Sequence, residues 1–242
     1  MKVIITNLIF ISLIILLNGC SENFFMSNRY QSTSTESKVI ALNGQTSFTV
    51  ENTNGNIDVS TSDTAKSIYC KIDKKVKSSE SVEDAHTHLS DININTTESG
   101  TGVKIKVTHP NSNGRNYEIR FDIIMPDNFN YDLNLGNGNI SVNSSTKNLT
   151  INIGNGNADA DVALNDNCNV SVSIGNGSID MKIPGSTNAS FNAQVGNGNV
   201  SNSGLSFESM HSNSRTLSGK LGSGEGSIDL SVGNGSISVS KK

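Results

Sequence analysis

Tryptophan is absent from this chain of 242 residues, and aromatic residues make up only 5% of it. Large globular cores take much of their buried area from aromatic side chains, so a bulky core of that kind is not expected. The chain has no extended basic run and its formal net charge is −4, which argues against a nucleic-acid partner. Hydrophobic residues are 34% of the chain, but they recur in regular order, which indicates a folded protein rather than a disordered one.

The sequence also lacks the motifs of common catalytic sites, namely GxSxG, HExxH, a Walker loop and paired CxxC. The histidines are not at the spacing of a metal site, and on a helix His86 and His88 would not face each other. Enzymes with a β-helix fold that cleave polysaccharides need clustered acids and aromatic side chains that hold the sugar rings. The aromatic residues of the segment 132–242 are only Phe191 and Phe207. We therefore expect no catalytic residue, no cofactor and no metal site.

One continuous apolar run, LIFISLIILL at residues 8–17, lies near the N-terminus. A membrane span needs about 20 apolar residues, so this shorter run predicts a signal peptide over residues 1–19. The run ends in LNGC, which resembles the lipobox of bacterial lipoproteins and marks Cys20 as the lipidated first residue of the mature protein. We expect a lipid anchor at Cys20 and a flexible tether at residues 20–38, because that segment is polar and rich in Ser and Thr. The alternative is a signal peptide cut elsewhere, with Cys20 incidental.

The other two cysteines, Cys70 and Cys168, lie far apart in the sequence. An exported protein could pair them, but the sequence alone does not bring them together. Two buried free thiols are the simpler interpretation.

Residues 39–130 alternate apolar and polar side chains in several short runs, which predicts an N-terminal β region. The residues Asn54-Gly55-Asn56 separate two of these runs and predict a turn. Helical periodicity occurs at residues 79–89, where Ser81 and Asp84 are placed to form a capping box. We expect one short helix within an otherwise all-β protein.

The tripeptide Gly-Asn-Gly organises residues 131–242 and occurs five times. Its copies are Gly136-Asn137-Gly138, Gly154-Asn155-Gly156, Gly175-Asn176-Gly177, Gly196-Asn197-Gly198 and Gly233-Asn234-Gly235. An apolar residue precedes each copy and another follows it five positions later, as in Ile174 and Ile179, with alternation on both sides. The first three intervals are 18, 21 and 21 residues, and the fourth, 37 residues, is close to two periods.

A fixed period of about 18–21 residues with one corner per repeat predicts stacked coils, that is, a β-solenoid. Glycine permits positive φ at the corners, and the asparagine between the glycines can hydrogen-bond to its copy in the next coil. Independent hairpin turns are the alternative, but the constant register disfavours them. The same register places Asp159 beside Asp180, and Asp161 beside Lys182. We expect solvated neighbours there rather than a calcium site, because calcium takes six to eight oxygen ligands.

Several features together resemble the bacterial putative-adhesin family of domains of unknown function. They are the unit ENTNGNIDV, a short helix, a strand ending in IIMP, the GNG repeats and the closing segment GSGEGSIDLSVGNGSISVS. The resemblance covers residues 39–242. It implies a right-handed, single-stranded β-helix at the cell surface or in the periplasm, and no catalytic residues.

The outward strand positions carry mainly polar side chains: Asn134, Ser141, Thr150, Asn152, Ser171, Ser173, Asn192, Ser201 and Ser231. Such a face suits weak contacts with a polysaccharide or another surface protein, although it is equally consistent with a plain soluble wall. We therefore expect a cell-envelope lipoprotein anchored through Cys20. The serine after that cysteine resembles the sorting signal of lipoproteins in two-membrane bacteria, and this resemblance implies the outer membrane or the cell surface. The expected role of the protein is a structural or adhesion-type module that is not an enzyme. A periplasmic binding or scaffold protein and a carbohydrate-active β-helix enzyme are the alternatives.

Overall fold

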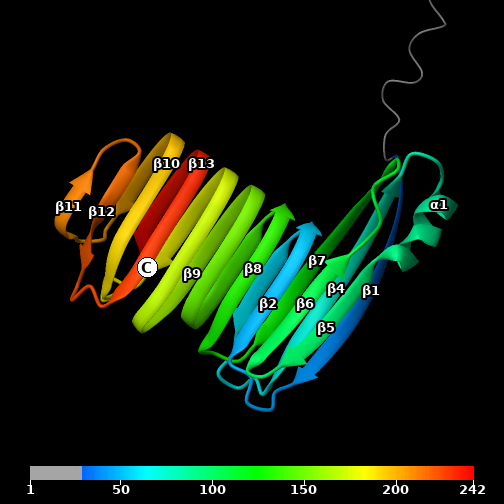
Figure 1. Ribbon diagram of the computed structural model, residues 1–242, viewed down its shortest axis with the longest axis horizontal. Helices are drawn as coiled ribbons and strands as arrows, with labels where there is room; N and C mark the ends of the chain where they lie inside the picture. The colour runs from blue at the N-terminus through cyan, green and yellow to red at the C-terminus, as the bar shows by residue number, and fades with distance from the viewer. Residues whose placement is uncertain (1–28) are drawn as a thin grey trace, which may run out of the picture.

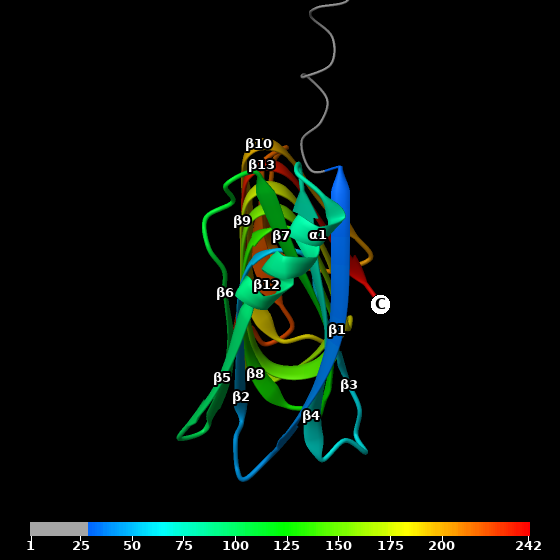
Figure 2. The same cartoon turned by 90° about the vertical axis from the view of Figure 1, so that its right-hand side faces the viewer.

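The computed structural model describes residues 29–242, apart from the side chains of residues 165 and 166. The predicted signal peptide (residues 1–19) and Cys20 lie outside the described residues. Strands lie side by side in a long stack, with β11 and β12 at one end and β1 with α1 at the other (Figure 1). Seen along the stack from the β1 end, the strands form two walls, and α1 lies across the opening between them (Figure 2).

The first half of the stack contains β1 (Tyr30–Ala41), β2 (Ser47–Asn54), β3 (Ile57–Thr61), β4 (Ser67–Ser78), α1 (Val82–Thr87), η1 (His88–Asp91), β5 (Asn93–Ser99), β6 (Gly102–Thr108), β7 (Arg115–Met125) and β8 (Phe129–Asn137). The second half contains β9 (Ile140–Ile183), β10 (Ala189–Ser203), β11 (Glu208–Ser212), β12 (Thr216–Leu221) and β13 (Gly226–Lys241). The expected all-β architecture with one short helix is therefore confirmed. Among the described residues, no helix combines the length and the apolarity that crossing a membrane requires.

The helix is shorter than predicted and continues into the 3-10 turn η1. It begins after Ser81, whose Oγ accepts a hydrogen bond from the backbone N–H of Asp84 at 3.0 Å. An N-cap of this kind satisfies one of the free N–H groups of the first helical turn. Asp84 also accepts two hydrogen bonds from Arg115 of β7, which fix α1 against the end of the stack.

Residues 30–38 belong to β1, so the prediction of a flexible tether is wrong for this part of the segment. The strand pairs with β4 in antiparallel register, from Tyr30 opposite Ser78 to Ala41 opposite Ser67. Its inward side chains are held by polar partners: Lys74 lies 2.9 Å from Glu36, and Lys38 donates to the backbone oxygen of Ile94 at 3.0 Å. The sequence predicts strands where apolar and polar residues alternate. β1 is mostly polar and largely lacks this alternation, so residues 30–38 were not predicted as a strand.

Coils pass from one wall to the other at the GNG corners. β2 and β3 are the two sides of the first coil and are joined at Asn54-Gly55-Asn56; both pair in parallel with the next coil, β2 with β8 and β3 with the start of β9. Inward side chains such as Phe48, Leu133, Ile140 and Val170 are at most 1% exposed and form one continuous core between the walls. Each coil thus completes its core against its neighbours, as expected for a solenoid.

The order of the coils in space differs from their order in the sequence. β13 lies between β9 and β10 and is parallel to both, so that Ile228 pairs with Val170 on one side and with Phe191 on the other (Figure 1). The interval of 37 residues is therefore not two successive coils. After β9, the chain leaves one layer unfilled and forms β10 in the layer beyond it. It then forms β11 and β12, which pair in antiparallel register and cover the end of the stack. Finally β13 fills the layer between β9 and β10.

The polar furrow as a candidate functional site

The second glycine of every GNG corner has a positive φ, between 129° and 143°. A Cβ at Gly156 would lie 1.7 Å from the backbone oxygen of Gly138, and one at Gly177 would lie equally close to Gly156. Only glycine allows both this backbone conformation and this approach of successive coils. The predicted corner residues thus lie in register along one line, and the same line begins in the first coil at Gly55 (φ 124°).

The middle asparagines of the corners form a continuous ladder. Its members, in their order along the stack, are Asn54, Asn137, Asn155, Asn176, Asn234 and Asn197. Each Nδ2 donates to the Oδ1 of the preceding member at 2.7–2.9 Å. All donors therefore point towards the β1 end, where Nδ2 of Asn54 donates to the backbone oxygen of Tyr117 at 3.4 Å. The side chains satisfy one another and hold the coils in register.

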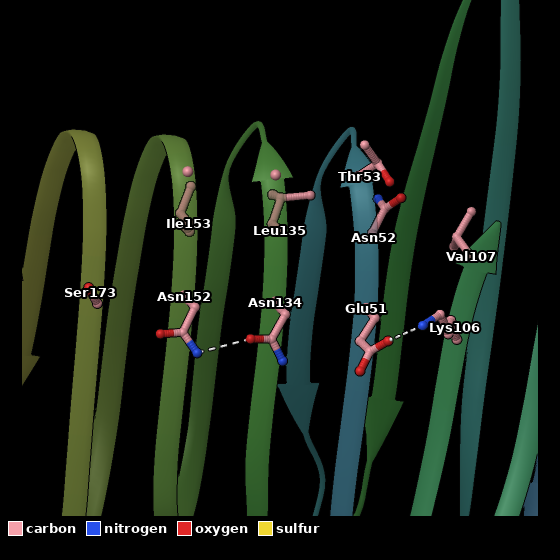
Figure 3. A pocket seen from close by; sticks show the side chains of 12 residues that line it. Glu51, Asn52, Thr53, Lys106, Val107, Asn134, Leu135, Asn152, Ile153 and Ser173 are labelled. Atoms are coloured by element: carbon pink, nitrogen blue, oxygen red, sulfur yellow. Dashed lines mark hydrogen bonds and ion pairs between the residues drawn. The ribbon is translucent and has the colours of Figure 1, made fainter. Parts of the chain in front are cut away.

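Next to this ladder, the first glycine of each corner leaves a polar furrow along one wall. Its floor is the outward row Gly136, Gly154, Gly175, Gly233 and Gly196, and Thr53 occupies the same position in the first coil. The edge of the furrow away from the ladder, called the lower edge below, is a row of polar side chains: Lys106, Glu51, Asn134, Asn152, Ser173, Ser231 and Gln194. Figure 3 shows the first five of these at one height across neighbouring strands. The furrow is thus bounded by the amides of the ladder on one side and by amides, hydroxyls and the ion pair of Glu51 and Lys106 on the other.

The furrow widens into a hollow towards each end. One hollow, of about 470 Å³, lies beside β2, β6, β8 and the part of β9 around Asn152 (Figure 3). The other, of about 830 Å³, lies beside β10 and β13 and is bordered by Arg215, whose Nη1 donates to the backbone oxygen of Gly196 at 3.5 Å. Both hollows are open to solvent along the same wall.

The charged side chains of the first hollow gather around Glu51. Lys104 Nζ donates to Glu51 Oε1 at 2.5 Å, and Lys106 Nζ lies 3.1 Å from Oε2. These hydrogen bonds hold the pKa of the Glu51 carboxyl below its ordinary value, so the group is ionised at neutral pH. Asn134 accepts from Asn152 at 2.9 Å and donates to Asp132 at 2.8 Å, which orients the amides of the lower edge.

The predicted outward residues divide between the two walls. Asn134, Thr150, Asn152, Ser171, Ser173, Asn192 and Ser231 lie on the wall that carries the furrow, and Ser141 and Ser201 lie on the other. None of them is buried. The sequence reasoning missed Glu51, Asn52 and Lys106, which precede the repeats. The ENTNGN unit held the signal for two of them, because aligning its Asn54-Gly55 with the Asn-Gly of a GNG corner places Glu51 beside Asn134.

The remaining candidates lie outside the furrow. Cys70 and Cys168 are both buried, in β4 and β9, and burial raises the pKa of the Cys70 thiol to about 12. His86 contacts Ser32, whereas His88 contacts Asp84 and Asp91. Within residues 29–242, no group of three or more His, Cys, Asp or Glu side chains is arranged to hold a metal ion.

The aspartate column of the opposite wall provides a test of the coil register. The backbone N–H of Ser178 donates to Asn157 Oδ1 at 3.0 Å, which sets an offset of 21 residues and places Asp159 beside Asp180. Asp161, expected beside Lys182, forms its ion pair with Lys242 at 2.7 Å.

Replacing Asp159 and Asp180 together with cysteine is expected to yield a disulfide under mild oxidation. Neighbouring strands lie about 4.8 Å apart, which is within the Cα spacing that a disulfide spans. Non-reducing peptide mapping by mass spectrometry would detect it. Cysteines at Asp159 and Ser201, three layers apart in the stack, provide the matched control and should stay reduced. Equal crosslinking in both pairs would refute the register.

Parallel coils, a corner ladder and a polar outer wall define the class of this protein as β-solenoid-like, with strands in an open sheet. A family model described as Toastrack DUF4097 matches residues 17–240, so the chain belongs to that family. The resemblance to a putative-adhesin family of unknown function is thereby confirmed. No curated protein matches the chain in sequence.

One solved structure supports the same fold. A protein described as a putative cell adhesion protein from Clostridium sporogenes is 16% identical, with a TM-score of 0.57, and the match covers 87% of this chain and 100% of that one. A putative adhesin from Bacteroides fragilis is 11% identical over 87% of this chain and 98% of its own, with a TM-score of 0.25. At these identities, the first match supports a shared fold and nothing further.

Proposed function

We propose that this protein is a non-catalytic, adhesion-type module of the cell envelope that binds an extended polymer or another surface through its furrowed wall. In this proposal, the chain is a lipoprotein held by a lipid on Cys20, at the outer membrane or cell surface. Its coils wind as a right-handed, single-stranded β-helix.

The observation that carries the proposal is the continuity of the furrow. Amide and hydroxyl side chains line it over successive layers that lie about 4.8 Å apart. A long ligand can therefore make the same weak contact at each layer, and many such contacts add up to useful avidity. The Clostridium sporogenes relative is described as a putative cell adhesion protein, which is in keeping with such a role.

A deletion strain tests this function directly. We expect the strain to attach less to a surface coated with envelope polysaccharide than its parent, and the intact gene to restore attachment. A gene that encodes Ser173→Trp tests the furrow, because the indole would cover the furrow from an exposed outward position. Tryptophan at Gly154, Gly175 or Gly233 would fill the furrow floor but would also damage the coils. Full restoration by Ser173→Trp would separate attachment from the furrow, and unchanged attachment of the deletion strain would refute the function itself.

The anchor makes a separate prediction. Replacing Cys20 with serine should move the protein from the membrane fraction to the soluble fraction, because the acyl chains that bury CH₂ groups in the bilayer are no longer attached. Immunoblots of fractionated cells would measure this, with Cys70→Ser as the matched control. Continued membrane association of the Cys20→Ser protein would rule out the lipid anchor.

A further inference from the structure

The hollow beside β2 exists because two strands separate there. β6 pairs with β2 from Ser47 to Glu51, where Glu51 lies opposite Lys106, and the pairing stops at that point. β2 continues and pairs with β8 as far as Asn54 on its other side. The gap left on the β6 side is the hollow of about 470 Å³, between Val107 and the continuing strand (Figure 3).

Asn52 lies at this gap in a position where other coils are apolar. Its register partner in the next coil is Leu135, followed by Ile153, and both are buried. Asn52 is 7% exposed, and its Nδ2 donates to the backbone oxygens of Ile119 at 2.8 Å and Asn54 at 3.2 Å. Its Oδ1 has no hydrogen-bond partner among the described residues. The two bonds from Nδ2 account for an amide here, but a buried acceptor without a donor destabilises a fold, so Oδ1 is open to a donor from a ligand.

One acceptor at the hollow lacks a donor. The carboxylate of Glu51 already accepts from Lys104 and Lys106, whereas Asn52 Oδ1 is unpaired among the described residues. The nearest cation, Lys106, is already paired with Glu51. A ligand rich in hydroxyl groups can donate to the unpaired oxygen, whereas an ionised phosphate or sulfate group has no donor to offer. None of the twelve residues that line the hollow is aromatic, so hydrogen bonds would dominate the binding.

We propose that this hollow binds a neutral, hydroxyl-rich glycan segment whose chain continues along the furrow over Asn134, Asn152 and Ser173. A hydroxyl of the glycan supplies the donor that Asn52 Oδ1 lacks, and the amides of the lower edge contact the following sugar units. An extended peptide fits less well, because it needs pockets for alternate side chains, whereas the outward positions of the furrow carry glycines and polar side chains in every layer. The inference rests on the proposed function and adds the class of ligand and the position where it docks.

Titration calorimetry of the full-length protein in detergent with cellohexaose, maltohexaose and mannohexaose tests the inference. At least one of these neutral hexasaccharides should bind, and better than an oligogalacturonate of equal length or a hexapeptide of Gly and Ser. Asn52→Leu, which installs the apolar residue type found in the other coils, should weaken binding about three- to tenfold, the loss expected for one hydrogen bond. Asn152→Ala, at an exposed position, should weaken it by a similar factor while leaving the melting temperature nearly unchanged.

The matched control is Asn143→Ala, an exposed asparagine on the opposite wall, which should bind like the unmodified protein. Equal affinity of all three variants would overturn the site, and preference for the oligogalacturonate or the peptide would overturn the ligand class. Absence of binding to every neutral hexasaccharide would also overturn the inference. The proposed function would still stand in that case if the deletion strain lost attachment, so the two failures are distinguishable.

Discussion

Replacing Gly156 with valine is expected to destabilise the protein by about 4 kcal/mol or more. The residue has a φ of 143°, and its Cβ would lie 1.7 Å from the backbone oxygen of Gly138. A β-branched residue is strained at this φ by itself, and the contact cannot be relieved without separating two coils. Separation breaks the hydrogen bond between Asn155 and Asn137, because the ladder passes through the same corner.

Thermal unfolding followed by circular dichroism would measure this effect. For a chain of this length, about 4 kcal/mol corresponds to a melting temperature lower by about 8–16 °C. Ser171→Val, at an exposed outward position of β9, provides the control and should change stability by less than about 0.5 kcal/mol. If both variants melted at the same temperature, the corner would not have the described geometry.

Ending the chain after Glu225 is expected to prevent folding of the second half of the stack. This truncation removes β13, whose inward residues Ile228, Leu230, Val232, Ile237 and Val239 are at most 2% exposed. Burying such a side chain contributes about 1.5–3 kcal/mol, so the loss is about 7–15 kcal/mol, comparable to the whole stability of a typical domain. β9 and β10 would also lose their shared partner and expose two unpaired edges, which favours aggregation.

Limited proteolysis and sedimentation of the truncated protein would test this prediction. A chain that ends after Ser240 is the control, because it keeps the buried residues of β13 and loses only two exposed lysines. If coils were stacked in sequence order, the chain ending at Glu225 would simply lose its last layer. Protease resistance of residues 189–221 in the truncated protein would therefore contradict the insertion of β13.

The corner geometry could be predicted from the sequence, but the order of the coils could not. Every corner repeats the same apolar positions, so Val195 and Val200 of one coil match Val232 and Ile237 of another in size and chemistry. The period therefore identifies a coil without identifying its neighbour in space. The position of β13 depends on the path of residues 204–225, which form β11 and β12 and contain no corner.

The candidate site was predicted only in part, for a related reason. Asn134, Asn152 and Ser173 belong to the periodic pattern and were found as outward polar residues. Asn52 occupies an inward position, where the pattern predicts an apolar side chain, and the lack of a donor for its Oδ1 appears only in three dimensions. Deviations from the repeat carry information that the repeat itself does not.

The corner ladder also governs how this protein ages chemically. Asn-Gly is the dipeptide in which the glycine nitrogen most readily attacks the asparagine side chain, releasing ammonia through a succinimide that water opens to aspartate or isoaspartate. In the stack, the nitrogens of Gly55 and Gly138 are engaged with the backbone oxygens of Asn137 and Asn155 at 3.0 Å and 2.9 Å, and the carboxamides are held by one another. The folded chain is therefore expected to keep its amides, whereas an unfolded chain converts them. Deamidation of Asn155 would place a carboxylate oxygen opposite the Oδ1 of Asn137, where the ladder needs a donor. Each episode of unfolding would therefore add deamidated residues that persist after refolding, and mass spectrometry would count them.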